Sequence, residues 1–209
     1  MISQYLEATN LTPSATSKEI KKFAQDAARL NCLGVCSYLG NALLLKKYAP
    51  NQKIVCVVGF PEGDPSHILQ DLDMAMNCID EYDVVVPRAY IVMKQYRAFK
   101  KIMDLVRQAT EGKVLKAIIE TSYLTEAKFQ PVIKICEACG VDIIKTNTGK
   151  YVRIRSLEDD VKLIQKYTKL PIKASGGIGT YKEAKTLIDL GVTRIGTSKA
   201  DAIISGEPK

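Results

Sequence analysis

The amino-acid sequence predicts an α/β fold, a single (β/α)8 barrel of the TIM-barrel type in which residues 1–209 form one domain. Eight short apolar runs recur at intervals of about 20 to 30 residues, the size of a βα unit, and helical patterns separate them. The length of 209 residues suffices for one sizeable core and is short for two. An open doubly wound sheet is the alternative, although no G-x-G-x-x-G follows the first strand.

The eight predicted strands are continuous hydrophobic runs, which is typical of parallel strands covered by helices. They lie at Gln4–Ala8, Cys32–Ser37, Lys53–Val58, Tyr82–Val86, Val114–Ile119, Val141–Thr146, Pro171–Ala174 and Thr193–Thr197.

Apolar residues at helical spacing predict helices between these strands. The stripes lie at 20–28, 68–79 and 99–106, and a shorter one follows at 184–188. Two capping boxes, Thr16 with Glu19 and Thr180 with Glu183, mark where the first and the last of these helices begin. Pro131, inside the segment 125–139, either kinks a helix or marks its first turn. The helix after the last strand is expected to be only a few residues long.

The composition, with 46% hydrophobic and 25% charged residues, is typical of a globular protein. No apolar run approaches the roughly 20 residues of a membrane helix, and residues 1–5 lack the features of a signal peptide, so a cytoplasmic location is expected. The net charge of +7 suits a protein that handles phosphorylated anions. It also suits nucleic-acid binding, but the basic residues are scattered and not interleaved with aromatic ones, which disfavours that partner.

Free thiols are a better interpretation of the six cysteines than disulfides. Cys36 and Cys56 lie inside predicted strands, where a buried thiol acts as a small apolar side chain. Cys136 and Cys139 form a C-x-x-C, but no second pair exists and His67 is the only histidine, so no metal site is expected. The helix patterns do not separate core-facing from partner-facing sides, so a homodimer is compatible with the sequence.

Charged residues interrupt four successive predicted strands. They are Asp83, Lys116, Lys145 and Lys173. Because strand side chains alternate between faces, all four can point into the barrel, with three lysines around one carboxylate. Burial and like charge disfavour the ammonium form, so at least one amine should be neutral near pH 7 and able to attack a carbonyl carbon, while Asp83 moves protons. Any one of these residues alone could be a solvated strand end, and Lys116 could simply pair with Asp83.

Glycine-rich segments follow the seventh and eighth strands and predict a phosphate site. They contain Gly176, Gly177, Gly196 and Ser198. Glycines let main-chain N–H groups approach an anion, and the dipole of the next helix adds to the attraction. The loops after strands seven and eight are a frequent phosphate site in barrels. Thr148, Gly149 and Lys150, after the sixth strand, could supply a further donor and a cation, whereas tight turns without a ligand also favour glycine.

These motifs resemble those of the deoxyribose-phosphate aldolase family. The segment IIKTNTGK at 143–150 is similar to the family's I-K-T-S-T-G around its Schiff-base lysine. KASGGI at 173–178 resembles the segment with its second active-site lysine, and DVVVP at 83–87 resembles the strand with its proton-shuttling aspartate. Supporting matches lie at 55–61, 115–121 and 194–198, in family order.

The resemblance implies a reversible aldol reaction that joins acetaldehyde and glyceraldehyde 3-phosphate into 2-deoxyribose 5-phosphate, with no cofactor. Lys145 would form the imine, Lys173 would favour the neutral amine of Lys145, and Asp83 would relay protons through water. Rivals are a related class I aldolase with a different phosphorylated or unphosphorylated substrate, a phosphosugar-binding barrel without covalent catalysis, and a non-catalytic barrel.

The sequence departs from the family pattern at three places. Gly179 stands where an arginine is frequent, Lys199 follows Ser198 where paired serines are frequent, and Glu7 stands where an aspartate is common. The first two changes fall in the inferred phosphate pocket. We therefore expect Lys199 or Lys150 to replace the charge of the missing arginine.

Overall fold

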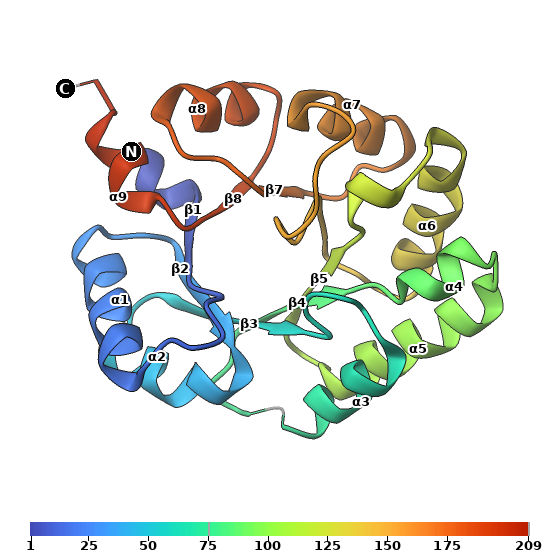
Figure 1. Cartoon of the computed structure of the whole chain (residues 1–209), viewed down its shortest axis with the longest axis horizontal. Coiled ribbons are helices and arrows are strands. Elements are labelled where there is room, and N and C mark those ends of the chain that lie inside the picture. Colours follow the sequence, from blue (N-terminus) through green and yellow to red (C-terminus); the bar gives the residue numbers. More distant parts are fainter. Residues whose placement is uncertain (75, 209) are drawn as a thin grey trace.

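Eight parallel strands close into a barrel in the computed structural model of the chain, which describes residues 1–74 and 76–208 (Figure 1). The strands pair in chain order, and β1 closes the ring against β8. They are β1 Leu6–Thr9, β2 Gly34–Tyr38, β3 Lys53–Val58, β4 Glu81–Val85, β5 Val114–Ile118, β6 Ile143–Lys145, β7 Ile172–Ser175 and β8 Arg194–Thr197. The predicted barrel is therefore confirmed, and the open sheet is excluded.

Helices form a ring around the strands (Figure 1). They are α1 Ser17–Arg29, α2 Ala42–Tyr48, α3 Pro65–Asp73, α4 Arg88–Val92, α5 Tyr96–Ala109, α6 Glu126–Ala138, α7 Leu157–Tyr167, α8 Tyr181–Asp189 and α9 Ala200–Ser205. Short 3-10 turns lie at Ile2–Tyr5, Leu39–Asn41 and Thr121–Tyr123. The two ends of the chain meet beside α9, where the Ile2 N–H donates to Glu207 at 2.9 Å (Figure 1).

Strand alternation divides the apolar residues into two layers. The larger cluster lies between strands and helices, and on β4 it includes Tyr82 and Val84. A small cluster of Cys36, Val55 and Val57 packs inside the barrel on the side of β2 and β3. The rest of the interior is free for polar side chains, which is where the charged residues of the strands lie.

All eight predicted strands exist; β3 has the predicted limits, and the ends of the others differ by at most two residues. The largest change in length is at β6, predicted at Val141–Thr146 and observed at Ile143–Lys145. β1 begins late because the preceding residues form a 3-10 turn. Both capping boxes are confirmed: Thr16 with Glu19 opens α1, and Thr180 with Glu183 opens α8.

Two helix predictions need correction. The stripe predicted at 68–79 is helical only to Asp73; Ala75 lies outside the described residues, and Ile79 is buried in the turn that leads into β4. Ile79 is apolar because it packs into the core from this turn, and it does not belong to a helix face. Pro131 lies inside α6, which begins at Glu126, so it does not mark the first turn. The helix continues through Pro131 without the N–H that this residue lacks.

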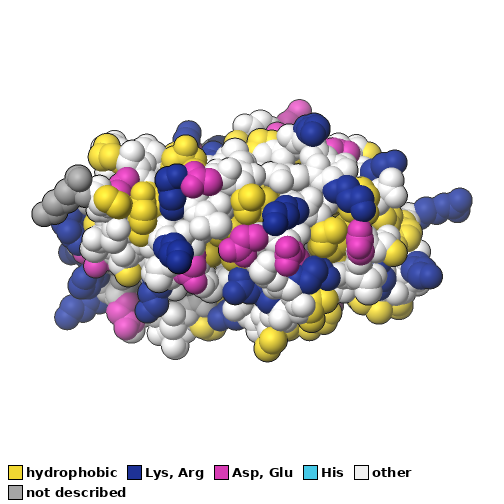
Figure 2. All heavy atoms as spheres, turned by 90° about the horizontal axis from the view of Figure 1, so that it is seen from above, with side chains coloured by type: hydrophobic (Ala, Val, Ile, Leu, Met, Phe, Trp, Pro, Cys, Tyr) yellow, Lys and Arg dark blue, Asp and Glu magenta, His cyan; other side chains and the backbone are white. Residues whose placement is uncertain are grey.

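The outer surface mixes charges of both signs. On the side covered by α7, α8 and α9, lysines and arginines are interspersed with acidic and apolar side chains (Figure 2). Cys36, Cys56 and Cys136 are buried free thiols, as expected. Within the described residues, none of the helices combines the length and the apolar character needed to span a membrane.

Candidate active site

Asp83 lies at the centre of a buried cluster of charged side chains inside the barrel. Its strand turns Tyr82 and Val84 outward, so Asp83 between them points inward. Its carboxylate accepts hydrogen bonds from Lys145 at 2.7 Å, Lys173 at 2.6 Å and Lys116 at 3.0 Å. The structure thus brings together the four charged residues that interrupt the strands, from β4 to β7.

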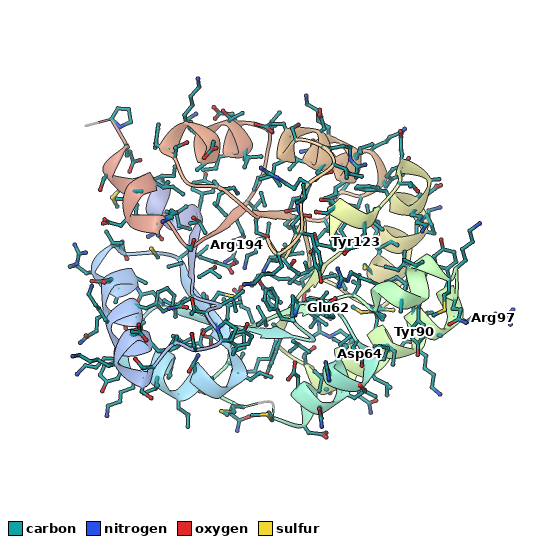
Figure 3. The ribbon with its side chains drawn as sticks, in the orientation of Figure 1. Glu62, Asp64, Tyr90, Arg97, Tyr123 and Arg194 are labelled. Atoms are coloured by element: carbon teal, nitrogen blue, oxygen red, sulfur yellow. The ribbon has the colours of Figure 1, made fainter. Side chains whose placement is uncertain are left out.

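Two further carboxylates and an arginine complete this cluster, and the sequence analysis did not place them in it. Glu7 on β1 contacts Lys173 and lies 3.4 Å from Lys116. Glu81 on β4 lies 2.5 Å from the Nζ of Lys116. Arg194 lies 3.4 Å from one oxygen of each glutamate, on the inner side of β8 (Figure 3).

The expectation of three lysines around a single carboxylate was therefore wrong. Three carboxylates face the same interior, and each lysine there has an acidic partner. The signal was present in the sequence, because Glu81 lies two residues before Asp83 and shares its face of the strand. Glu7 is likewise flanked by the apolar Leu6 and Ala8. A glutamate in a short strand usually reaches solvent, so one strand at a time does not reveal that both are buried.

These carboxylates keep two of the lysines charged. Burial alone would lower the pKa of Lys173, but Asp83 and Glu7 outweigh burial and raise that pKa above its ordinary value. The pKa of Lys116 is raised by the same two carboxylates against the same opposing effect of burial. Lys116 and Lys173 are ammonium groups at neutral pH, so neither is the neutral amine that the sequence analysis expected.

The three lysines in turn lower the pKa of Asp83. Burial would raise the pKa of the Asp83 carboxyl, but Lys116, Lys145 and Lys173 together hold it well below its usual range. Asp83 is therefore an ionised carboxylate at neutral pH. The centre of the barrel therefore holds an ionised carboxylate that is hydrogen-bonded by three lysines.

A cavity of about 460 Å³ opens next to this cluster, and Lys145 is the one residue of the cluster that lines it. Asp83, Lys116 and Lys173 lie beneath it. The other residues predicted for the site line the same cavity: Thr148, Gly149, Lys150, Gly176, Gly177, Gly196, Ser198 and Lys199. Thr9, Leu11, Thr12, Ser175, Ile178, Gly179 and Thr197 complete the lining. These residues include three lysines and no carboxylate, so the cavity attracts anions.

Glycines let two loops approach each other at the cavity wall. Gly149 and Gly176 have φ angles of 78° and 101°, and a Cβ on Gly149 would lie 3.3 Å from the Cα of Gly176. Gly196 has another role, because a Cβ there would lie 3.0 Å from the Cε of Lys173 and 3.1 Å from the Cβ of Ser175. The absence of a side chain at Gly196 leaves room for the buried lysine.

The turn after β7 lines the cavity and contains main-chain N–H groups that have no protein acceptor among the described residues. Over residues 1–74 and 76–208, the N–H groups of Gly177 and Ile178 donate to no protein acceptor. Those of Gly179 and Thr180, at the start of α8, donate to the carboxylate of Glu183 at 2.9 and 3.0 Å. The favourable helix dipole expected here is thus offset by a carboxylate, and an anion would be held by the turn itself.

Glu120 orders the loop that follows β6, and it was missed as a site residue. It is buried two residues after the end of β5, in the left-handed region, with a φ of 52°. Its carboxylate accepts hydrogen bonds from the N–H of Thr148 at 2.9 Å and from its hydroxyl at 2.5 Å. The hydroxyl of Thr148, expected as a donor to phosphate, therefore already donates to Glu120.

Known proteins resemble this chain along its whole length, although no family model matches it. A deoxyribose-phosphate aldolase from Finegoldia magna is 36% identical over 98% of this chain and 99% of its own length. One from Halalkalibacterium halodurans is 34% identical over 99% of this chain and 96% of its own length. The chain belongs to the deoxyribose-phosphate aldolase family.

Solved aldolase structures share the barrel. One described as an aldolase is 31% identical, covers 98% of this chain and 94% of its own, and superposes with a TM-score of 0.92. A deoxyribose-phosphate aldolase from Aeropyrum pernix, described as tetrameric, is 23% identical, covers 98% and 89% of the two chains, and has a TM-score of 0.85. The second likeness concerns the fold alone.

Within this aldolase family member, Lys199 lies beside the glycine that replaces the frequent arginine. A Cβ on Gly179 would lie 3.9 Å from the Cγ of Lys199, so the lysine stem packs against the place where a side chain is missing. The side chain of Lys150 points toward Phe60 in the loop after β3, with its Nζ 6.0 Å from the centre of the ring. Of the two expected substitutes for the arginine, Lys199 is the one next to Gly179.

Proposed function

We propose that this protein is a class I aldolase that reversibly cleaves 2-deoxy-D-ribose 5-phosphate into acetaldehyde and D-glyceraldehyde 3-phosphate through a Schiff base on Lys145. The observation that carries the proposal is the position of Lys145: among the buried lysines of the cluster, it alone lines the cavity. Relatives named deoxyribose-phosphate aldolase over nearly the whole chain support the choice of substrate.

Lys145 is the nucleophile in this proposal. Its amine attacks the aldehyde carbon C1 of the sugar, and loss of water leaves an iminium ion. The iminium ion accepts the electron pair of the C2–C3 bond as that bond breaks, which gives an enamine on Lys145 and releases glyceraldehyde 3-phosphate. Protonation of C2 and hydrolysis by water then release acetaldehyde and restore the amine.

Asp83 and Lys173 assist beneath the cavity. The amine of Lys145 lies 2.7 Å from an oxygen of Asp83, the same oxygen that Lys173 contacts at 2.6 Å. The ammonium group of Lys173 shares this oxygen of Asp83 with Lys145, so the carboxylate still has a cationic partner when the Lys145 amine attacks the sugar. The ionised Asp83, through water, takes up protons released from Lys145 and from the C3 hydroxyl and returns one to C2.

The glycine turn and the lysines of the lining would hold the phosphate. The free N–H groups of Gly177 and Ile178 can donate to its oxygens, and Lys199 lies beside the same turn. Held there, the phosphate places the sugar chain across the cavity toward Lys145. Ser198, also in the lining, can add a hydroxyl donor.

Borohydride trapping tests the proposal. The protein is incubated with 2-deoxyribose 5-phosphate, reduced with borohydride, digested, and the modified peptide is mapped by mass spectrometry. We expect a reduced adduct on Lys145, because reduction converts the imine into a stable secondary amine. If no lysine carries an adduct and the folded protein releases no acetaldehyde, the aldolase proposal fails and a phosphosugar-binding barrel without covalent catalysis remains.

Replacing both Lys199 and Lys150 by alanine is expected to weaken binding of the phosphorylated sugar. A charge-assisted contact to phosphate contributes roughly 1.5–3 kcal/mol, so the KM for 2-deoxyribose 5-phosphate should rise about tenfold or more, with little change in kcat. Steady-state kinetics of acetaldehyde release measure this. Lys182→Ala, at an exposed position on α8, is the control. An unchanged KM in the double variant would show that neither lysine replaces the missing arginine.

A further inference from the structure

The loop between β6 and α7 is pinned to its neighbours at Tyr151. The Tyr151 hydroxyl donates to Glu62 at 2.5 Å and accepts from Arg88 at 2.8 Å. The guanidinium of Arg88 lies 4.4 Å from the centre of the Tyr151 ring and 4.7 Å from that of Tyr123. Glu62 and Tyr123 lie over the central part of the barrel (Figure 3). Loops after β3, β4, β5 and β6 are thus tied together at this point.

A second anchor holds the same loop four residues later. Arg155 donates to the carbonyl oxygens of Thr121 and Leu124, both at 2.9 Å, and pairs with the buried Asp160 at 3.0 Å. Arg88 in the first anchor and the partners of Arg155 in the second are largely buried, so the three residues between the anchors have little freedom to move.

Arg153 lies between the two anchors and faces the glycine turn after β7. Its neighbours Val152 and Ile154 are 91% and 63% exposed and point to solvent. Arg153 is exposed as well, but its guanidinium reaches the turn: its Nη2 lies 3.7 Å from the position that a Cβ on Gly177 would occupy. Within the part of the chain that the structure describes, Arg153 forms neither a hydrogen bond nor an ion pair, unlike Tyr151 and Arg155.

The turn that Arg153 faces is the one with unused N–H groups. Gly177 lines the cavity, and its N–H and that of Ile178 have no protein acceptor among the described residues. Lys199 lies beside the same turn at Gly179, whereas Lys150 leans toward Phe60. The turn is therefore flanked by one cation from the loop after β8 and one from the loop after β6.

We propose that Arg153 is a substrate-binding residue that contacts the phosphate of the sugar and makes the protein selective for phosphorylated substrates. The inference deepens the proposed function and rests on it. Arg153 can offer two parallel N–H donors to phosphate, which a lysine cannot. The two anchors hold its backbone in place, so binding requires only a rotation of an exposed side chain.

The test compares two substrates and one simple anion in the Arg153→Gln variant. We expect the KM for 2-deoxyribose 5-phosphate to rise about tenfold or more with kcat nearly unchanged, because one charge-assisted contact is lost. The kcat/KM for unphosphorylated 2-deoxyribose should stay the same. The Kd for inorganic phosphate, measured by calorimetry, should rise by a similar factor. Arg153→Lys should recover part of the loss, and Arg97→Gln, at the outer end of α5, should change nothing (Figure 3).

Two results would overturn the inference: an unchanged KM and Kd in Arg153→Gln, or an equal loss with both sugars, which would indicate a structural role. The calorimetric measurement needs no turnover, so it separates this inference from the proposed function. Should the wild-type protein fail to cleave either sugar, weaker phosphate binding in Arg153→Gln would still support an anion site at Arg153, while the aldolase proposal would fall.

Discussion

Lys145→Arg is expected to lower the turnover of 2-deoxyribose 5-phosphate by at least about a thousandfold, because a guanidinium stays protonated and cannot form an imine. The guanidinium of the variant can still pair with the Asp83 carboxylate, which Lys145 contacts at 2.7 Å. Acetaldehyde release measures the loss of activity, and borohydride with the same sugar should leave the protein without an adduct.

Phosphate binding by Lys145→Arg distinguishes a loss of catalysis from misfolding. The arginine variant should still bind inorganic phosphate, since the glycine turn and Lys199 are untouched, and its thermal unfolding should remain cooperative. Lys134→Arg, the same change at an exposed position of α6, serves as the matched control and should keep full activity. Substantial turnover by folded Lys145→Arg would rule out covalent catalysis at this lysine.

Asp83→Asn is expected to reduce both stability and activity. The change leaves the ammonium groups of Lys116 and Lys173 beside a neutral amide in the interior, and removing one partner of a buried ion pair costs about 3–5 kcal/mol of the free energy of unfolding. Loss of the carboxylate that moves protons should lower kcat by about a hundredfold or more in the protein that remains folded. Urea unfolding and kinetics at low temperature measure the two effects. The control is Asp104→Asn in an exposed pair with Lys100, where a loss of at most about 0.5 kcal/mol is expected.

The difference in unfolding free energy between wild type and Asp83→Asn should depend on pH, in a direction that follows from the lowered pKa of Asp83. The pKa of Asp83 in the folded protein lies well below its ordinary value, which holds in the unfolded chain. Its ionised form therefore adds stability that is fully present above the unfolded pKa of about 4 and is lost as the pH falls toward the folded pKa. The gap in unfolding free energy between wild type and Asp83→Asn should shrink below pH ~4. A gap that stays constant there would contradict this account of the cluster.

Much of the fold could be predicted from local patterns. Each strand is a short apolar run that can be recognised from residues adjacent in the sequence. Within Glu81–Val85, the alternation of side chains between the two faces suffices to place Asp83 on the inner face. The capping box of Thr16 and Glu19 is equally local. The helix predicted from the stripe at 68–79 was too long. An apolar residue such as Ile79 can pack into the core from a turn as well as from a helix, and periodicity alone does not distinguish the two.

The balance of charges in the interior could not be predicted in the same way. Glu7 and Lys173 are 166 residues apart in the chain, and they meet only because β1 pairs with β8 when the barrel closes. Arg153 is a similar case, since its loop has no periodicity and its orientation depends on the partners of Tyr151 and Arg155.

The sequence by itself determined the eight strands, their alternation, and the presence of Asp83, Lys116, Lys145 and Lys173 on inward faces, because these depend on residues one or two positions apart. Only the tertiary structure decided which lysine lines the cavity, which carboxylates surround the other two, and which cations flank the glycine turn. These properties depend on distances between side chains from different strands and loops, and closure of the barrel sets those distances.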